Sequence, residues 1–176
     1  MKKRTVALIL AVTLVLGIAI GGTVAWLTTK TDPVTNTFTV GNIDIELTET
    51  ERDYPLIPGN LLDKDPTVTV DGGSVDCWLF VKVEKSDNLD DFISYAIADG
   101  WTVLENGVYY REVSASANDQ SFAVLAGNTV TVKPTVDKAA LDALTDATRP
   151  TLTFTAYAVQ RANFNSPADA WAEAIK

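Results

Sequence analysis

The sequence predicts an all-β fold, an antiparallel sandwich or barrel with short peripheral helices. Several short segments alternate apolar and polar residues with the period of two that is typical of strands. Turn residues separate these segments at short intervals, and the two helical patterns are short. A chain of 176 residues fits one domain. We expect this domain to span residues 26–176, after an export leader.

The first 25 residues have the pattern of a signal peptide. Residues 2–4 are basic, and residues 5–20 are apolar. Small residues stand at positions −3 and −1 of a predicted cut, Thr23 and Ala25, so that Trp26 would become the first residue. Because the uncharged run is also long enough to cross a bilayer at roughly 20 residues, a retained membrane anchor is the alternative.

Strand patterns begin soon after the predicted cut. Residues 38–47 alternate, but the apolar parity switches across Gly41-Asn42, which predicts a bulge or tight bend. Residues 51–66 contain prolines and are predicted to form a loop. A short strand at 68–70 and the strongest strand pattern, 75–84, follow.

Two hairpins are predicted in the second half of the chain. Residues 101–104 and 108–113 flank Asn106-Gly107, a dipeptide that favours tight hairpin turns. A second hairpin is expected between residues 122–125 and 130–136.

Other patterns complete the chain. They are a polar turn or helical turn at 86–91, a strand at 93–97, a short helix at 138–144, a long strand at 151–160 and a C-terminal helix. Ser166 and Pro167 fit the N-cap and first position of that last helix.

The net charge excludes several partners. The chain has 14 basic and 23 acidic residues; losing the three basic residues of the leader leaves 11 against 23, or −12. Such an acidic domain repels nucleic acid and anionic lipid, so we expect no nucleic-acid partner and membrane contact only through the leader before cleavage. The single cysteine, Cys77, cannot form an internal disulfide, so the fold depends on its hydrophobic core.

No residue pattern supports catalysis or a cofactor. The chain has no histidine, which removes the usual zinc ligands and the base of Ser-His-Asp and Cys-His systems. Cys77 lies on the apolar face of its predicted strand and is interpreted as a buried structural residue. The remaining candidates are carboxylates for calcium and tryptophans for sugar stacking, interpreted as loop charge and core respectively: Asp63, Asp65, Asp87, Asp90, Asp91, Trp78, Trp101 and Trp171. We expect no enzyme, metal or cofactor site.

Several motifs resemble the TasA/camelysin family of Gram-positive bacteria. The junction at 21–26, followed by Asn-Thr-Phe-Thr-Val-Gly-Asn-Ile-Asp-Ile at 36–45, is similar to the N-terminus of that family. Residues 58–59, 68–70, 73–76, 156–160 and 165–171 carry less specific similarity, and residues 86–150 add little.

The resemblance implies a jelly-roll-like sandwich whose leader is cut by the signal peptidase SipW. It also implies a secreted subunit of biofilm-matrix fibres, in the matrix or at the cell surface, that polymerises with itself; other matrix proteins or an accessory subunit are further candidate partners. In such fibres the N-terminal segment pairs with the sheet of the next subunit. On this chain the donor would lie in residues 26–40, with five candidate anchors: Trp26, Leu27, Val34, Phe38 and Val40.

Two points limit what is carried over from the resemblance. Camelysin is described as a metalloprotease, but the absence of histidine means that this activity is not expected here. Pro33 lacks a donor N–H, so it must lie at a strand end, at a bulge or facing outward. A monomeric or membrane-tethered adhesin or carbohydrate-binding sandwich is the alternative function.

Overall fold

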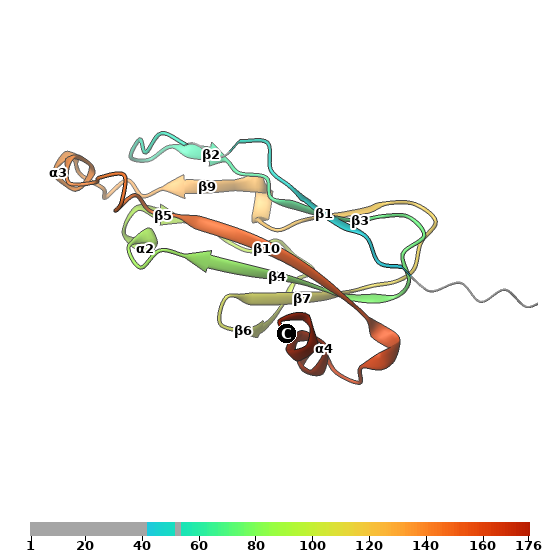
Figure 1. The fold of residues 1–176 in the computed structure, drawn as a ribbon. Helices are drawn as coiled ribbons and strands as arrows, with labels where there is room; N and C mark the ends of the chain where they lie inside the picture. Colours follow the sequence, from blue (N-terminus) through green and yellow to red (C-terminus); the bar gives the residue numbers. More distant parts are fainter. Residues whose placement is uncertain (1–41, 52–53) are drawn as a thin grey trace, which may run out of the picture. The chain divides into compact units, whose positions relative to one another are not determined.

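The computed structural model describes residues 42–51 and 54–176, which form mostly antiparallel β-sheet with short helices (Figure 1). The predicted all-β fold with short helices is therefore confirmed. The predicted leader, its cut and all five donor anchors lie outside the described residues.

A four-stranded sheet has the order β10-β4-β7-β6. The bounds of its strands are Leu152–Gln160 for β10, Cys77–Lys85 for β4, Val108–Val113 for β7 and Thr102–Glu105 for β6. The hairpin predicted around Asn106-Gly107 is present as β6 and β7, and Gly107 has the positive φ of 76° that its turn requires. The strongest strand pattern became β4 at the centre of this sheet.

Two three-stranded sheets, β1-β3-β8 and β2-β9-β5, contain the remaining described strands. Their bounds are Ile45–Thr48 (β1), Leu61–Asp63 (β2), Thr67–Val70 (β3), Ile93–Ser94 (β5), Gln120–Ala123 (β8) and Thr129–Val132 (β9). Only three residues separate β2 from β3, and both pair with the segment that contains β8 and β9.

Two details of the predicted strands are wrong. β8 and β9 do not pair with each other as a hairpin, because β8 pairs with β3 whereas β9 pairs with β2 and β5. The residues between them form a 3₁₀ turn, Ala126–Asn128, in which Gly127 and Asn128 have positive φ. This turn carries the chain from β8 in one three-stranded sheet to β9 in the other, instead of reversing it into a hairpin. Within the predicted loop 51–66, Leu61–Asp63 forms β2 because Leu62 is buried in the core.

The helices are peripheral and short. They are α2 (Leu89–Phe92), α3 (Lys138–Asp142) and α4 (Pro167–Ala174), with a second 3₁₀ helix at Arg161–Asn163. The predicted start of α4 is confirmed, because the Ser166 side chain accepts a hydrogen bond from the backbone N–H of Asp169 at 3.2 Å.

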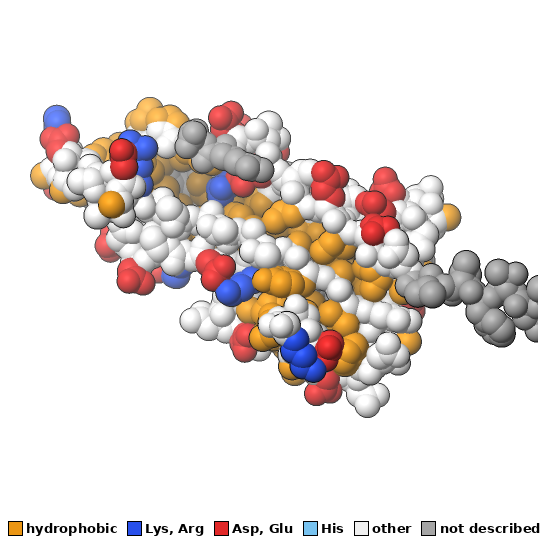
Figure 2. All heavy atoms as spheres, viewed as in Figure 1, with side chains coloured by type: hydrophobic (Ala, Val, Ile, Leu, Met, Phe, Trp, Pro, Cys, Tyr) orange, Lys and Arg blue, Asp and Glu red, His pale blue; other side chains and the backbone are white. Residues whose placement is uncertain are grey.

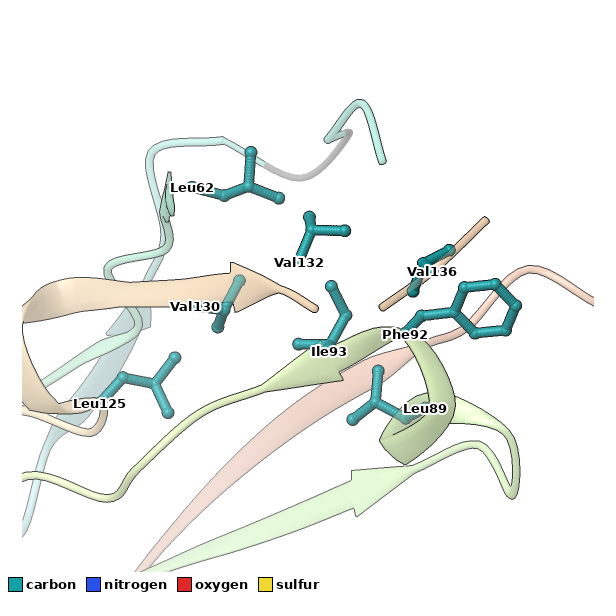
Figure 3. Close-up of a cluster of buried hydrophobic side chains, with 8 residues drawn as sticks. All are labelled: Leu62, Leu89, Phe92, Ile93, Leu125, Val130, Val132 and Val136. Atoms are coloured by element: carbon teal, nitrogen blue, oxygen red, sulfur yellow. The ribbon is translucent and has the colours of Figure 1, made fainter. Parts of the chain in front are cut away.

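Three groups of buried side chains hold these elements together. The first lies between β4 and β7 on one side and β3 and the end of β8 on the other; its most buried members include Val68, Leu79, Val81 and Val124. A second group gathers side chains of β2, β5, β9 and α2, which point toward one another in Figure 3. In the third, α4 covers the opposite face of the four-stranded sheet, where Trp171 packs on Phe80 and Tyr157.

Candidate self-assembly edge

β10 is a long strand at the edge of its sheet, bonded on one side to β4. Its nine residues, Leu-Thr-Phe-Thr-Ala-Tyr-Ala-Val-Gln, include no charge, no proline and no glycine. Edge strands that lack these features are templates for pairing with another chain, because a row of backbone groups stays available. β10 is therefore a candidate surface for strand addition.

The hydrogen-bond register shows which backbone groups of β10 point away from β4. Directly paired residues of an antiparallel ladder alternate between bonded and non-bonded pairs. At the two ends of this ladder, Ser86 donates its N–H to the Thr151 carbonyl at 3.0 Å, and Arg161 donates to the Asp76 carbonyl at 2.9 Å. The odd-numbered residues between 151 and 161 therefore bond β4. The N–H and C=O groups of the even-numbered residues of β10 point toward the open edge.

The core beside this edge is incompletely covered. The even-numbered side chains of β10 pack against the central core but remain half-exposed: Leu152, Phe154, Ala156 and Ala158. On β1, which lies close to β10, Ile45 and Leu47 are also half-buried against the same core. Figure 2 shows apolar side chains gathered on the face where β10 lies in Figure 1. An added strand with apolar side chains would complete this burial.

Other sheet edges in the described part of the chain have features that hinder pairing. β6 has only four residues, contains a register shift between Val103 and Glu105, and ends on the charged Glu105. The strands β1, β2 and β5 have two to four residues, and β1 and β2 carry an acidic side chain. Short length, a bulge and charge each disfavour edge-to-edge association.

The edge beside β8 is closed in a different way. Ala98 donates its backbone N–H to the Val124 carbonyl at 2.9 Å, and the Trp101 indole donates to the Ala123 carbonyl at 2.8 Å. On the same side of the core, the guanidinium of Arg111 lies 3.8 Å from the ring centre of Phe122, and burial lowers the pKa of Arg111.

A cleft of about 880 Å³ lies where β10 begins. Leu152 and Thr153 line it together with the apolar side chains of Leu56, Leu62, Leu141 and Leu144. The buried Lys64 also lines the cleft, but its ammonium is paired with Glu49.

Tyr54 lies on the wall of the same cleft; its hydroxyl donates to the Glu51 backbone carbonyl at 2.5 Å and lies 3.3 Å from the Glu49 carboxylate. Burial, together with the nearby carboxylates, raises the pKa of Tyr54 to about 12. This hydroxyl stays neutral near pH 7, so the cleft has a mixed lining of apolar side chains, polar groups and a paired charge.

The cysteine and two of the carboxylates considered as candidate catalytic or calcium-binding residues are buried or paired within the fold. Cys77 is fully buried, and burial raises the pKa of its thiol to about 11. Asp90 pairs with Lys85, and Asp65 accepts hydrogen bonds from Thr50. Within residues 42–51 and 54–176, no group of three or more His, Cys, Asp or Glu residues could hold a metal ion.

The tryptophans support the packing interpretation. Trp78 of β4 and Trp171 of α4 are buried in the core between α4 and the four-stranded sheet, with 7% and 6% of their surface exposed. Trp101 is half-buried and holds Ala123 through its indole N–H.

The alternating pattern at 151–160 predicted the strand β10 but not its position at the edge of a sheet. The available signal was the absence of charge across nine residues in a chain of which 21% is charged.

Comparison with family models, curated proteins and solved structures found no match for this chain. Among the described helices, none is long and apolar enough to cross a membrane.

Proposed function

We propose that this chain is a secreted structural subunit that assembles with its own copies into extracellular fibres. In this proposal the signal peptidase SipW removes residues 1–25, and the jelly-roll-like domain that follows polymerises in the matrix or at the cell surface. The N-terminal segment freed by cleavage donates a strand to a neighbouring copy. The resemblance to the TasA/camelysin family at the leader junction supports this proposal.

The unprotected edge of β10 is the observation that carries the proposal. A donated strand adds backbone hydrogen bonds along the edge, and its alternate side chains gain burial against the core. For the even-numbered side chains of β10, this burial stabilises the assembly by roughly 25 cal/mol per Å² of apolar surface removed from water. The acidic charge keeps the exported subunit soluble until a strand is available.

The test is to replace Ala156, whose N–H points toward the open edge, by proline. Because this N–H does not bond β4, the Ala156→Pro variant should fold but lose one edge donor and present a proline ring to any added strand. The matched control is Ala156→Ser, which keeps the N–H. We expect fibres in negative-stain images of exported wild-type and Ala156→Ser protein, and few or none for Ala156→Pro.

Circular dichroism of the Ala156→Pro protein checks that its sheet structure is retained. Normal fibre abundance in the folded Ala156→Pro variant would rule out β10 as the acceptor. Wild-type protein that stays monomeric at high concentration and binds glycans would favour the adhesin alternative. Deleting residues 26–40, the whole predicted donor range, tests the donor in the same assay, and we expect this deletion to abolish fibres.

A further inference from the structure

The apolar residues of the segment 34–40 share one parity. Val34, Phe38 and Val40 are even-numbered, whereas the odd-numbered residues 35, 37 and 39 are all threonine. In a strand, residues two apart lie on the same face. A strand formed by residues 34–40 would therefore have one mainly apolar face and one threonine face.

The backbone of β10 dictates how such a strand can pair. Residues directly opposite each other in an antiparallel ladder point their side chains to the same face. In each such pair, the backbone N–H and C=O groups of the two residues either all point toward the other strand or all point away from it. On β10 the even-numbered residues have core-facing side chains and edge-facing backbone groups. Burying the apolar face of the donor therefore requires even-numbered donor residues opposite even-numbered residues of β10.

This parity also accommodates Pro33. An odd-numbered donor residue directs its backbone nitrogen away from β10 in this arrangement, so no ladder hydrogen bond is lost at Pro33. The pairing parity that buries the apolar side chains is thus also the parity in which Pro33 loses no hydrogen bond. Two independent properties of the segment agree on one pairing.

The apolar residues of β10 then select one antiparallel register. It places Val34 opposite Ala158, Phe38 opposite Phe154 and Val40 opposite Leu152. A shift of two residues in one direction moves Val34 opposite the polar Gln160. A shift in the other direction moves Val40 beyond the start of β10. Only this register sets all three apolar donor residues against apolar residues of the strand.

A chain cannot pair with its own β10 in this register. Asn42 accepts a hydrogen bond from the Val75 N–H at 3.2 Å, next to Asp76, which bonds Arg161 at the far end of β10. Val40 would have to lie beside Leu152, nine residues or about 30 Å from Arg161. The two residues from Val40 to Asn42 span about 7 Å at most. The antiparallel donor must therefore come from another copy.

We propose that residues 34–40 of one copy pair antiparallel with β10 of the next, with Val34, Phe38 and Val40 opposite Ala158, Phe154 and Leu152. This inference rests on the proposed function and specifies its partner and register. In each copy the donor strand leaves the domain near Asn42, at the Arg161 end of β10. The domain of the copy that donates to it lies at the opposite end of β10, beside Leu152. Such a head-to-tail contact repeats from copy to copy, and it produces a fibre when the rotation between copies does not close a ring.

Disulfide cross-linking tests the register. Val34→Cys and Ala158→Cys chains, each with its leader, are co-expressed and exported together, then oxidised. Bonded antiparallel pairs have a Cα separation of about 5.5 Å, within the range that a disulfide spans. We expect a disulfide between the two variants, identified by mass spectrometry, and a second one between Phe38→Cys and Phe154→Cys chains.

Matched controls use the opposite parity and the native thiol. Thr35→Cys with Ala158→Cys should give little product, because the two side chains point to opposite faces. The native Cys77 is fully buried, so it should not compete for oxidation in the folded protein.

Each outcome bears on either the register or the function. Fibres in which Thr35→Cys links to Ala158→Cys, or in which Val34→Cys links to Phe154→Cys instead of Ala158→Cys, would overturn the register and leave the proposed function standing. Links formed within a single chain would overturn the exchange between copies. Absence of any assembly by the wild-type protein would contradict the proposed function as well.

Discussion

The Cys77 thiol gives the structure a pH dependence at the scale of one residue. Burial raises its pKa from 9.0 to about 11, so the unfolded chain releases this proton before the folded chain does. The free energy of unfolding should therefore fall as pH rises from about 9 toward 11, by up to about 1.4 kcal/mol per pH unit for this group. Urea denaturation at several pH values measures this slope.

The control for that prediction is Cys77→Ala, which removes the titrating group. Its smaller side chain lowers stability at every pH, so the comparison concerns the slope alone. We expect a shallower loss of stability between pH 9 and 11 in Cys77→Ala than in the wild type. Identical slopes in the two proteins would show that the thiol does not titrate differently on folding.

At the scale of elements, Trp171 is the large side chain with which α4 packs on the sheet. Trp171 lies 5.4 Å from Phe80 and 5.1 Å from Tyr157 between ring centres, and its indole donates to Glu105 at 2.7 Å. Trp171→Ala should lower the free energy of unfolding by about 3–5 kcal/mol, measured by urea denaturation. Trp171→Phe keeps an aromatic ring and should lose clearly less. Equal losses would contradict ring packing as the main contribution.

Local patterns predicted most of the elements. The Asn106-Gly107 turn and the capped start at Ser166 were predictable because their signals lie within a few residues. The β8–β9 hairpin was wrong because a glycine turn between two apolar runs can also displace a strand to new partners. Which strands become neighbours depends on long-range packing, and that information is absent from short windows of sequence.

The same distinction between local and long-range information applies to the candidate site. Sequence reasoning could propose a donor because its signals, a leader junction followed by an alternating segment, are contiguous. The edge position of β10, the proposed acceptor, could not be predicted, since an edge is defined by the order of strands in a sheet. The parity with which the proposed pairing accommodates Pro33 depends on the hydrogen bonds of β10 to β4.

At the scale of the whole molecule, charge should control the rate of assembly. Without the leader the chain has 11 basic and 23 acidic residues, a net charge of −12, so exported copies repel one another as they approach. Raising the ionic strength from about 0.01 M to about 0.1 M shortens the Debye length from about 30 Å to about 10 Å and should accelerate assembly. Light scattering of exported protein over time measures this. A slower rate at higher salt would show that attraction between charges drives the first contact.

The most direct measurement of strand exchange uses one chain that carries both Val34→Cys and Ala158→Cys. After export and oxidation, the protein is separated on a denaturing gel without reductant. Each chain then offers one donor and one acceptor, so the account predicts a ladder of covalent multimers that collapses to monomer when reductant is added. A product that remains monomeric, or that stops at dimer, would contradict head-to-tail exchange of the N-terminal strand.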